Sequence, residues 1–361
     1  MLFLPYESFK YAMIRKYLSI IVLLIFGILI SSFTFYGYQL IKAPNILVDK
    51  PDREVIIAPS TTFRELQSLF NKEEITHNIV AFSFMAKLMD YDKKIVPGKY
   101  LLKQNMTNLE AIRLLRSGNQ LPVNITFNNI RLKDDIGKKI TLNTGITVDD
   151  FDSALATFVK ENKDGFTDQN VIAMFIPNTY QVYYTISAKA LVERMHQEYN
   201  SFWNSDRLSK AKALGMTPME VSILASIVQA ESVKTDEGFI IAGLYINRLK
   251  RGIALQADPT LVFASGDFSI KRVLNIHKEI DSPYNTYKYR GLPPGPINMP
   301  FIRSIDAVLN YKKHNYIYMC AKEDFSGYHN FASTLKAHNI NATKYQKALS
   351  IEMRKAKLNR E

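Results

Sequence analysis

The sequence Thr217-Pro-Met-Glu-Val-Ser-Ile-Leu-Ala-Ser-Ile-Val-Gln-Ala-Glu231 predicts an α-helix with a well-marked start. Thr217 can cap the helix, Pro218 suits its first position, and Glu220 completes a capping box. The residues that follow are almost all apolar. We therefore expect a helix that begins at about residue 218 and continues to Glu231.

One face of this predicted helix combines an apolar stripe with a single acid. Val221, Leu224, Val228 and Glu231 are three or four residues apart, so they lie on the same face. Apolar surroundings penalise a carboxylate and raise its pKa, so the group can stay protonated near neutral pH. Glu231 is thus a candidate general acid. The alternative is that Glu231 lies in the last turn and points to water.

Polar loops follow a second predicted helix over residues 239–249. They contain Leu255-Gln-Ala-Asp-Pro-Thr260, Ser282-Pro-Tyr-Asn-Thr-Tyr287 and Gly291-Leu-Pro-Pro-Gly-Pro296. Loops held by proline and glycine often carry binding sites. Their polar groups could hydrogen-bond sugars, and two tyrosines, Tyr284 and Tyr287, could stack on pyranose rings.

Each of these features also has a purely structural interpretation. Asp258, just before Pro259, can cap a helix. The two tyrosines can simply pack. For His329, we favour a satisfied polar residue near a strand end over a catalytic role.

The N-terminal part of the chain predicts a membrane anchor. No charged residue occurs from 17 to 41, and residues 18–30 are almost wholly aliphatic. About 20 such residues cross the hydrocarbon core, whereas the apolar part of a signal peptide has about 7–15. We therefore favour an uncleaved transmembrane helix over residues 17–41 rather than a cleaved signal peptide. The basic residues of segment 1–16 indicate a cytoplasmic N-terminus, which places the rest outside the cell (inner) membrane.

The remaining chain divides into a small module and a larger domain. Residues 42–53, with two prolines and little periodicity, read as a linker. Residues 54–120 have the order strand–helix–helix–strand, which is typical of a small α/β module. Residues 121–350 mix helices and strands without a regular βαβ period, which predicts an α+β domain. Residues 351–361 form a basic C-terminal tail.

Composition narrows the classes of partner. The 361 residues include 46 Lys and Arg against 34 Asp and Glu, a formal charge of +12. These charges are dispersed, which favours membrane-surface attraction and solubility over nucleic-acid binding. Cys320 is the single cysteine, so no internal disulfide is possible. It lies in an apolar stretch, 316–321, that reads as a buried strand, and no metal or cofactor motif is present.

Taken together, these motifs resemble the endolytic murein transglycosylases, the YceG-like family. The similarity covers most of the chain after Leu18. The matching segments are Leu224-Ala-Ser-Ile-Val-Gln-Ala-Glu231, Asn247-Arg-Leu249, Leu255-Gln-Ala-Asp-Pro-Thr260, Tyr284-Asn-Thr-Tyr287, Gly291-Leu-Pro-Pro-Gly295 and His329-Asn-Phe331. Two positions depart from the family pattern: Gln229 and Asn178 stand where acidic residues are frequent.

The resemblance implies a function and a site. Glu231 corresponds to the catalytic glutamate, and module 54–120 to a LysM-like domain. The reaction would cleave the bond between N-acetylmuramic acid and N-acetylglucosamine in nascent strands, leave 1,6-anhydro ends and terminate glycan elongation. Peptidoglycan synthases, the penicillin-binding proteins, would be partners. The implied substrate-binding residues are Gln256, Asp258, Tyr284, Asn285, Thr286, Tyr287 and Asn330.

Three alternatives remain at this point. A muramidase-type hydrolase would use Glu231 together with Asp258. A membrane-anchored peptidoglycan-binding protein would bind the wall without cutting it. A membrane-attached nucleic-acid binder would rest on net charge alone.

Overall fold

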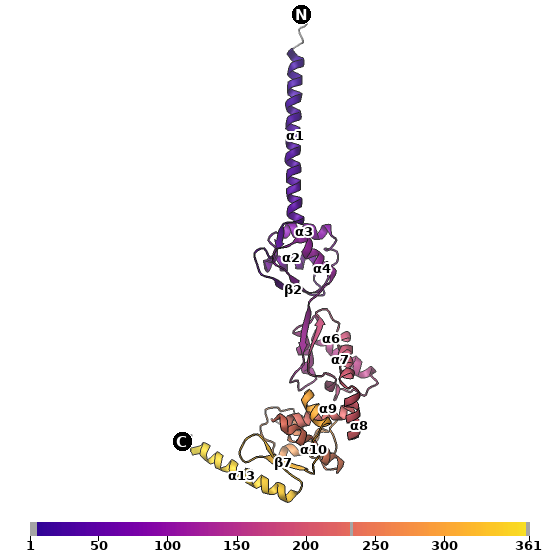
Figure 1. Ribbon diagram of the computed structural model, residues 1–361, viewed down its shortest axis with the longest axis vertical. Helices are drawn as coiled ribbons and strands as arrows, with labels where there is room; N and C mark the ends of the chain where they lie inside the picture. Colours follow the sequence, from indigo (N-terminus) through magenta and orange to yellow (C-terminus); the bar gives the residue numbers. More distant parts are fainter. Residues whose placement is uncertain (1–5, 232–233, 359–361) are drawn as a thin grey trace. The chain divides into compact units, whose positions relative to one another are not determined.

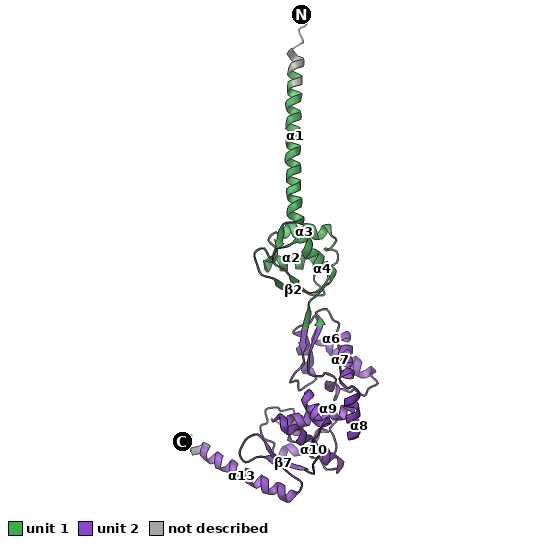
Figure 2. Ribbon diagram, viewed as in Figure 1, with its two compact units in different colours: residues 1–123, 182–185 green, residues 124–181, 186–361 purple. Residues whose placement is uncertain are grey.

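A computed structural model describes residues 6–231 and 234–358 (Figure 1). The chain forms two compact units (Figure 2). Unit 1 consists of residues 1–123 and 182–185, and unit 2 of residues 124–181 and 186–361. The predicted segments 1–16 and 351–361 include residues 1–5 and 359–361, which lie outside the described part of the chain.

Unit 1 begins with a long apolar helix and continues as a small mixed module. Its elements are α1 (Tyr6–Ile41), β1 (Pro44–Ile46), β2 (Arg53–Ile57), α2 (Phe63–Lys72), α3 (Ile79–Leu88), β3 (Gly98–Leu102), β4 (Met106–Thr107) and α4 (Asn108–Ser117). Within α1, the span Met13–Ile41 contains an 18-residue stretch with a mean hydropathy of 2.6, and none of that stretch is buried in the fold. The helix is therefore long and apolar enough to anchor the chain in a membrane.

The module has the predicted order of strand, helix, helix and strand. Strands β2 and β3 pair antiparallel, and helices α2, α3 and α4 supply buried side chains such as Phe70, Phe82 and Ile112 to a common core. Capping boxes at Thr62 and Thr107 fix the starts of α2 and α4. Local sequence signals thus define most elements of this module.

The segment expected to be a linker belongs partly to the module. Residues 44–46 form β1, which pairs with β4, and Ile46 and Leu47 are completely or almost completely buried. Asn45 secures this strand, because its Nδ2 donates to Asn108 Oδ1 at 2.6 Å and its Oδ1 accepts from the Asn78 amide at 2.7 Å. A strand this short has no periodicity to detect, which is why the linker interpretation was wrong here.

Unit 2 is a mixed α+β domain in which helices predominate. Its helices are α5 (Asp134–Thr141), α6 (Val148–Glu161), α7 (Ala188–Phe202), α8 (Ser205–Leu214), α9 (Pro218–Glu231), α10 (Gly238–Lys250), α11 (Asp258–Ser265), α12 (Ile302–Leu309) and α13 (Leu335–Leu358), with short 3-10 turns at Val171–Met174, Thr235–Glu237 and Asn275–Glu279. Strands β7 (Tyr318–Ala321) and β8 (His329–Ala332) pair antiparallel. The expected C-terminal tail is helical as far as Leu358, because α13 continues through it.

Strands β5 (Pro122–Thr126) and β6 (Thr179–Tyr183) pair in a two-stranded sheet. The division between the units falls within both strands. The burial of β5 alternates along the strand, as the two faces of a strand require.

Helix α9 lies at the centre of the packing in unit 2. Its start is as predicted: the Glu220 carboxylate accepts from the Thr217 amide at 2.7 Å, and the Glu220 amide donates to Thr217 Oγ1 at 3.2 Å. All residues from Val221 to Val228 are buried, because α10, α11 and α12 pack around the helix. The helix is therefore covered on all sides rather than on one face from Val221 to Val228, and its last turn lines a cavity.

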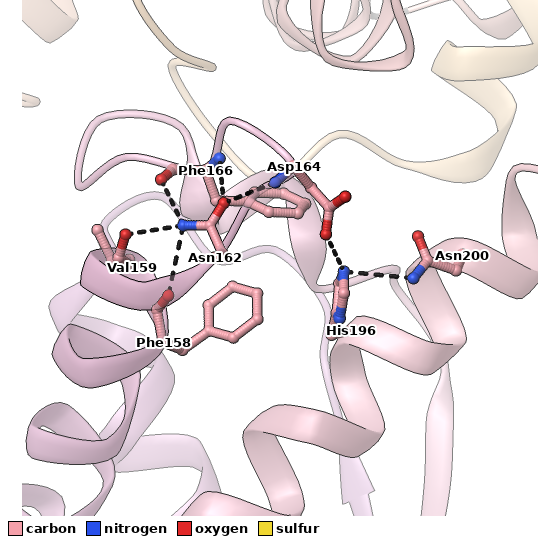
Figure 3. Close-up of polar contacts among 7 residues, drawn as sticks. All are labelled: Phe158, Val159, Asn162, Asp164, Phe166, His196 and Asn200. Carbon is pink, nitrogen blue, oxygen red and sulfur yellow. Dashed lines mark hydrogen bonds and ion pairs between the residues drawn. The ribbon is translucent and has the colours of Figure 1, made fainter.

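One asparagine closes the end of helix α6 and shapes the loop that follows it (Figure 3). Asn162 follows the last turn of α6, and its Nδ2 donates to the carbonyl oxygens of Phe158, Val159 and Phe166. Its Oδ1 accepts from the amides of Asp164 and Phe166 at 3.1 and 2.9 Å. One side chain therefore satisfies the end of the helix and shapes the following loop.

A histidine of α7 contacts both this loop and helix α6. His196 Nε2 lies 2.9 Å from a carboxylate oxygen of Asp164 and 3.2 Å from Asn200 Nδ2. Its ring also contacts Phe158 and Phe166, with centroid distances of 5.1 and 6.0 Å. Figure 3 shows the His196 side chain reaching from α7 to Asp164 in the loop after α6, so the contacts of His196 connect α7 to α6 and to its loop.

Replacement of Asn162 tests this description. Asn162→Ala removes five hydrogen bonds and leaves partly buried backbone groups without partners, so we expect the free energy of unfolding to fall by about 1–3 kcal/mol. Asn200→Ala, which removes one exposed contact, should change it by less than about 0.5 kcal/mol. Chemical denaturation of both variants makes the comparison; equal losses would contradict it.

Candidate active site

The site is built around the carboxyl of Glu231 in the last turn of α9. Its Oε1 accepts a hydrogen bond from the Tyr245 hydroxyl at 2.8 Å. Burial raises the pKa of Glu231 from 4.5 to about 7, the Tyr245 hydrogen bond partly lowers it, and the nearby charge of Asp258 raises it. The carboxyl therefore exchanges its proton near neutral pH, as a group that acts both as acid and as base requires.

Tyr245 was not among the predicted site residues. It lies in α10, is 1% exposed, and reaches Glu231 because α10 packs against α9. Burial and the neighbouring Glu231 charge raise the pKa of Tyr245 well above 10, so its hydroxyl remains a donor. The signal in the sequence is a tyrosine within the apolar first part of the helix, residues 238–246. Such a pattern does not identify its partner.

Arg248, one turn further along α10, organises the loop beside the site. Its Nε donates to the Ala254 carbonyl at 2.9 Å and its Nη1 to the Ile317 carbonyl at 2.7 Å. Its Nη2 donates to Gln256 Oε1 at 2.5 Å. The guanidinium group is thus buried among neutral acceptors, and it connects the loop before α11 to strand β7.

Gln256 and Asp258 lie on this loop and face the cavity. Gln256 is exposed and has a φ of 53°, a left-handed conformation that a non-glycine residue adopts only at a cost. Asp258 is the first residue of α11, but the cap position belongs to Ala257 and no side chain bonds there. The structural alternative, in which Asp258 only caps the helix, is therefore not what the structure shows. Its carboxylate accepts from the Tyr287 hydroxyl at 2.5 Å.

Asn285 and Thr286 serve the loop rather than the cavity. Asn285 is 0% exposed, and its Nδ2 donates to the carbonyls of Lys278 and Ile280. Its Oδ1 accepts from the amides of Tyr287 and Lys288. Every polar group of this side chain is occupied, so it has none left for a sugar. This corrects the expectation that Asn285 binds substrate.

Thr286 is 1% exposed and holds the neighbouring loop in place. Its hydroxyl accepts from the Ala257 amide at 3.0 Å and lies 2.8 Å from Thr260 Oγ1, while its carbonyl accepts from the Gln256 amide at 3.0 Å. The expectation of direct substrate contact is corrected here as well. Thr286 fixes the unusual backbone of Gln256.

Two further predicted residues lie away from the acid. Among the described residues that line the cavities beside Glu231, neither Tyr284 nor Asn330 is present. The Tyr284 ring packs on Phe263 at 4.6 Å and its hydroxyl donates to the Gln169 carbonyl. Asn330 Nδ2 donates to Glu323 at 2.8 Å. The structure thus brings together Glu231, Gln256, Asp258 and Tyr287 of the predicted set.

Two cavities meet at Glu231 and Asp258. The larger has a volume of about 1170 Å³ and the smaller about 340 Å³, and both acids line both. Tyr245, Gln256 and Tyr287 line the smaller cavity. Among residues 6–231 and 234–358, no three His, Cys, Asp or Glu side chains gather as metal ligands would. A ligand that fills both cavities would therefore pass directly over the acid.

Cys320 and Gln229 have roles that differ from simple core packing. Cys320 is in β7, as expected, but it is only half-buried and lines both cavities. Gln229 accepts from the Phe301 amide and donates to the Met299 carbonyl at 3.3 Å. The neutral amide thus ties α9 to the loop before α12.

His329 begins β8 and is satisfied by a buried acid, as the sequence suggested. Its Nδ1 and amide nitrogen each lie 2.8 Å from an oxygen of Glu237, which is 4% exposed. The pair supports the strand that carries one wall of the smaller cavity.

The raised pKa of Glu231 has a measurable effect on stability. Between pH 4.5 and about 7 the unfolded chain releases this proton while the folded chain keeps it, so stability falls as pH rises through that window. Glu231→Gln removes this loss of stability at high pH, because its side chain does not titrate, and its amide oxygen can still accept the hydrogen bond from Tyr245. We expect this variant to be about 1–3 kcal/mol more stable than the parent at pH 8 and equally stable at pH 4.

Thermal unfolding across this pH range tests the expectation. Glu161→Gln, at an exposed acid outside the site, is the matched control and should follow the parent at every pH. Parallel curves for the parent and Glu231→Gln would show that the carboxyl titrates normally.

Comparison with known proteins places the chain in a family. The YceG-like family model matches residues 55–344. An endolytic murein transglycosylase of Streptococcus pneumoniae is 24% identical over 335 residues, 84% of this chain and 60% of that protein. One of Bacillus subtilis is 36% identical over 159 residues, 44% of this chain and 43% of that protein. The chain thus spans less than two thirds of the length of these relatives.

A solved structure agrees with the fold. The crystal structure of a YceG-like protein from Listeria monocytogenes is similar with a TM-score of 0.52 and 24% identity, over 80% of this chain and 98% of that chain. Because the family match extends over most of the sequence, and includes α9 and the loops around Glu231, the chain belongs to the YceG-like family.

Proposed function

We propose that this protein is an endolytic lytic transglycosylase that cuts peptidoglycan glycan strands, with Glu231 as its single acid and base. The observation that carries the proposal is one carboxyl with a pKa of about 7, held by a buried tyrosine where two cavities meet. The names of the S. pneumoniae and B. subtilis relatives support the same reaction.

In the first step, protonated Glu231 gives its proton to the glycosidic oxygen between N-acetylmuramic acid and N-acetylglucosamine. The bond from C1 to that oxygen breaks, and positive charge develops at C1 and the ring oxygen. In the second step, the ionised carboxylate accepts the proton of the C6 hydroxyl as that oxygen bonds to C1. The product is a 1,6-anhydro end, and Glu231 regains its proton without consuming water.

The internal nucleophile explains why one acid suffices. Hydrolases that use water or an enzyme nucleophile need two carboxyls. Here the second acid, Asp258, accepts a short hydrogen bond from Tyr287. Its negative charge also helps to keep Glu231 protonated before the reaction, because it raises the pKa of that carboxyl.

Substrate contacts would come from the loop before α11 and from Tyr287. The Gln256 side chain is exposed at the smaller cavity and the Tyr287 ring forms part of its wall. Amide and phenol groups suit the hydroxyl and acetamido groups of a neutral sugar. We therefore assign the sugar-binding role to Gln256, Asp258 and Tyr287.

The anchor and the module extend the proposal to the setting of the reaction. Helix α1 would hold the chain in the cell membrane, with the basic segment 1–16 in the cytoplasm and both units outside. We propose that residues 54–120 form a LysM-like module that contacts glycan. Anchored in this way, the enzyme would cut nascent strands beside the synthases that make them and so terminate elongation.

A muramidase-type hydrolase is the second candidate, because Asp258 lines both cavities together with Glu231. The two reactions differ in their products. Hydrolysis adds water to the new end, whereas transglycosylation leaves an anhydro end that is lighter by one water. Mass spectrometry of fragments from un-crosslinked strands separates them.

Substitution of the acid is the direct test. We expect Glu231→Gln to lower the rate of anhydro-end formation by about 10²–10⁴-fold, since the amide cannot transfer a proton. Glu161→Gln, at an exposed carboxyl outside the site, should retain the parental rate. Undiminished anhydro-end formation by Glu231→Gln would refute the assignment. Binding of sacculi with no fragments from the parent would favour a non-catalytic wall-binding protein.

Tyr245→Phe tests the tuning of the acid. Removal of the donated hydrogen bond raises the pKa of Glu231 above about 7, because that bond stabilises the carboxylate. The fall of kcat/KM on the alkaline side, about tenfold per pH unit above the pKa, should therefore move to higher pH. Rate profiles for the parent and Tyr245→Phe make the comparison, and a shift toward lower pH would contradict it.

A further inference from the structure

We infer that the larger cavity binds carboxylate groups, and that these belong to the peptides attached to the muramic acid residues of the glycan. The inference rests on the proposed function and specifies its substrate: strands that carry their peptides. It is drawn from the charge of the cavity wall, which differs on the two sides of Glu231.

The wall of the larger cavity carries four exposed cations, Arg131, Lys271, Arg272 and Arg303. No ion pair joins any of them to a carboxylate within residues 6–231 and 234–358. Of the described residues that line this cavity, only Glu231 and Asp258 are acids. The wall therefore has an excess of positive charge, and the fold itself provides no counter-ions for it.

The clustering does not follow from a basic run in the sequence. Arg131 precedes α5, Lys271 and Arg272 lie in the loop after α11, and Arg303 is in the first turn of α12. Three separate segments thus bring like charges to one cavity. Like charges repel, so such an arrangement raises the free energy of the empty site and favours an anionic ligand.

Two of the guanidinium groups are held in place by aromatic rings. Arg131 lies over Phe268 at 4.5 Å and Arg303 over Phe301 at 4.8 Å, measured to the ring centroids. Stacking fixes the plane of a guanidinium group and leaves its N–H edges open. Such edges match the two oxygens of a carboxylate.

The smaller cavity is different in this respect. Its arginine, Arg248, is buried and donates to three neutral acceptors, and its His329 pairs with Glu237. The smaller cavity therefore suits a neutral sugar, and the larger one suits a sugar that carries charge. The acid lies between them, where the bond to be cut would be.

The chemistry of the strand identifies the anion. Its pyranose rings are neutral, whereas the peptides on muramic acid carry several free carboxylates. A strand still attached to its lipid carrier offers a second source, the pyrophosphate at its end. Cations contributed by three segments around a cavity of about 1170 Å³ fit several carboxylates spread along a peptide better than one compact pyrophosphate.

The test compares native strands with strands whose carboxyls have been converted to methylamides, using the full-length protein in detergent. We expect the parent to prefer native strands by about tenfold in kcat/KM, through a lower KM, and to lose this preference at high salt. The combined variant Arg131→Gln, Lys271→Gln, Arg272→Gln and Arg303→Gln should show a preference close to one. If it does not fold, the loop pair Lys271→Glu and Arg272→Glu takes its place.

A matched control removes the same charge elsewhere. Lys139, Lys160, Lys163 and Lys212 are exposed and are not among the residues lining the larger cavity. Their combined replacement by Gln should keep the tenfold preference. Equal rates on native and amidated strands for the parent, or a full preference in the cavity variant, would overturn the inference.

Two further arms separate the remaining outcomes. A preference for lipid-linked strands that ignores amidation would mean that the anion is pyrophosphate, and would also overturn the inference. Binding of strands by the Glu231→Gln variant tests the cavity without the reaction. Tighter binding of native than of amidated strands can be measured in this variant even though it does not cleave them. Anhydro ends formed equally from both strands would reject this subsite alone, whereas their absence from all digests would reject the proposed reaction.

Discussion

The constraint on which the site depends is the burial of one carboxyl, that of Glu231, against the phenol of Tyr245. The two groups come from α9 and α10, so their contact exists only because these helices pack together. Burial opposes ionisation and the phenol favours it, and the balance places the pKa near 7. A more exposed carboxyl would have a lower pKa and would be ionised at neutral pH. A buried carboxyl without the phenol would have a higher pKa and would ionise less readily.

The surroundings of this pair divide the site by charge. On one side, Arg248 is buried among neutral acceptors and His329 pairs with Glu237, so the basic groups of that wall already have partners within the fold. On the other side, cations from three segments remain without carboxylate partners in the described structure. The motif residues Asn285 and Thr286 thus mainly hold the loops in place through hydrogen bonds to the backbone. The exposed residues beside them have the groups that a ligand can use.

Local signals predicted much of the fold, and tertiary contacts account for what they missed. The capping box at Thr217 and the strand–helix–helix–strand order of the module depend on neighbouring residues, so they could be recognised. Strand β1 pairs with β4 some sixty residues away, and Tyr245 meets Glu231 across a helix interface. The burial of Asn285 could not be predicted either, because the sequence of a loop does not show whether an asparagine side chain points into the loop or toward solvent.

The left-handed backbone of Gln256 has an electrostatic consequence for the acid. Glycine would adopt this conformation more easily, at a saving of about 1–2 kcal/mol, but it has no oxygen to accept from Arg248. With that oxygen in place, the guanidinium group is shared among amide and carbonyl dipoles and forms no ion pair with Glu231. The buried cation is therefore satisfied by neutral dipoles and is not among the groups that shift the pKa of Glu231, so this pKa is set by burial, Tyr245 and Asp258.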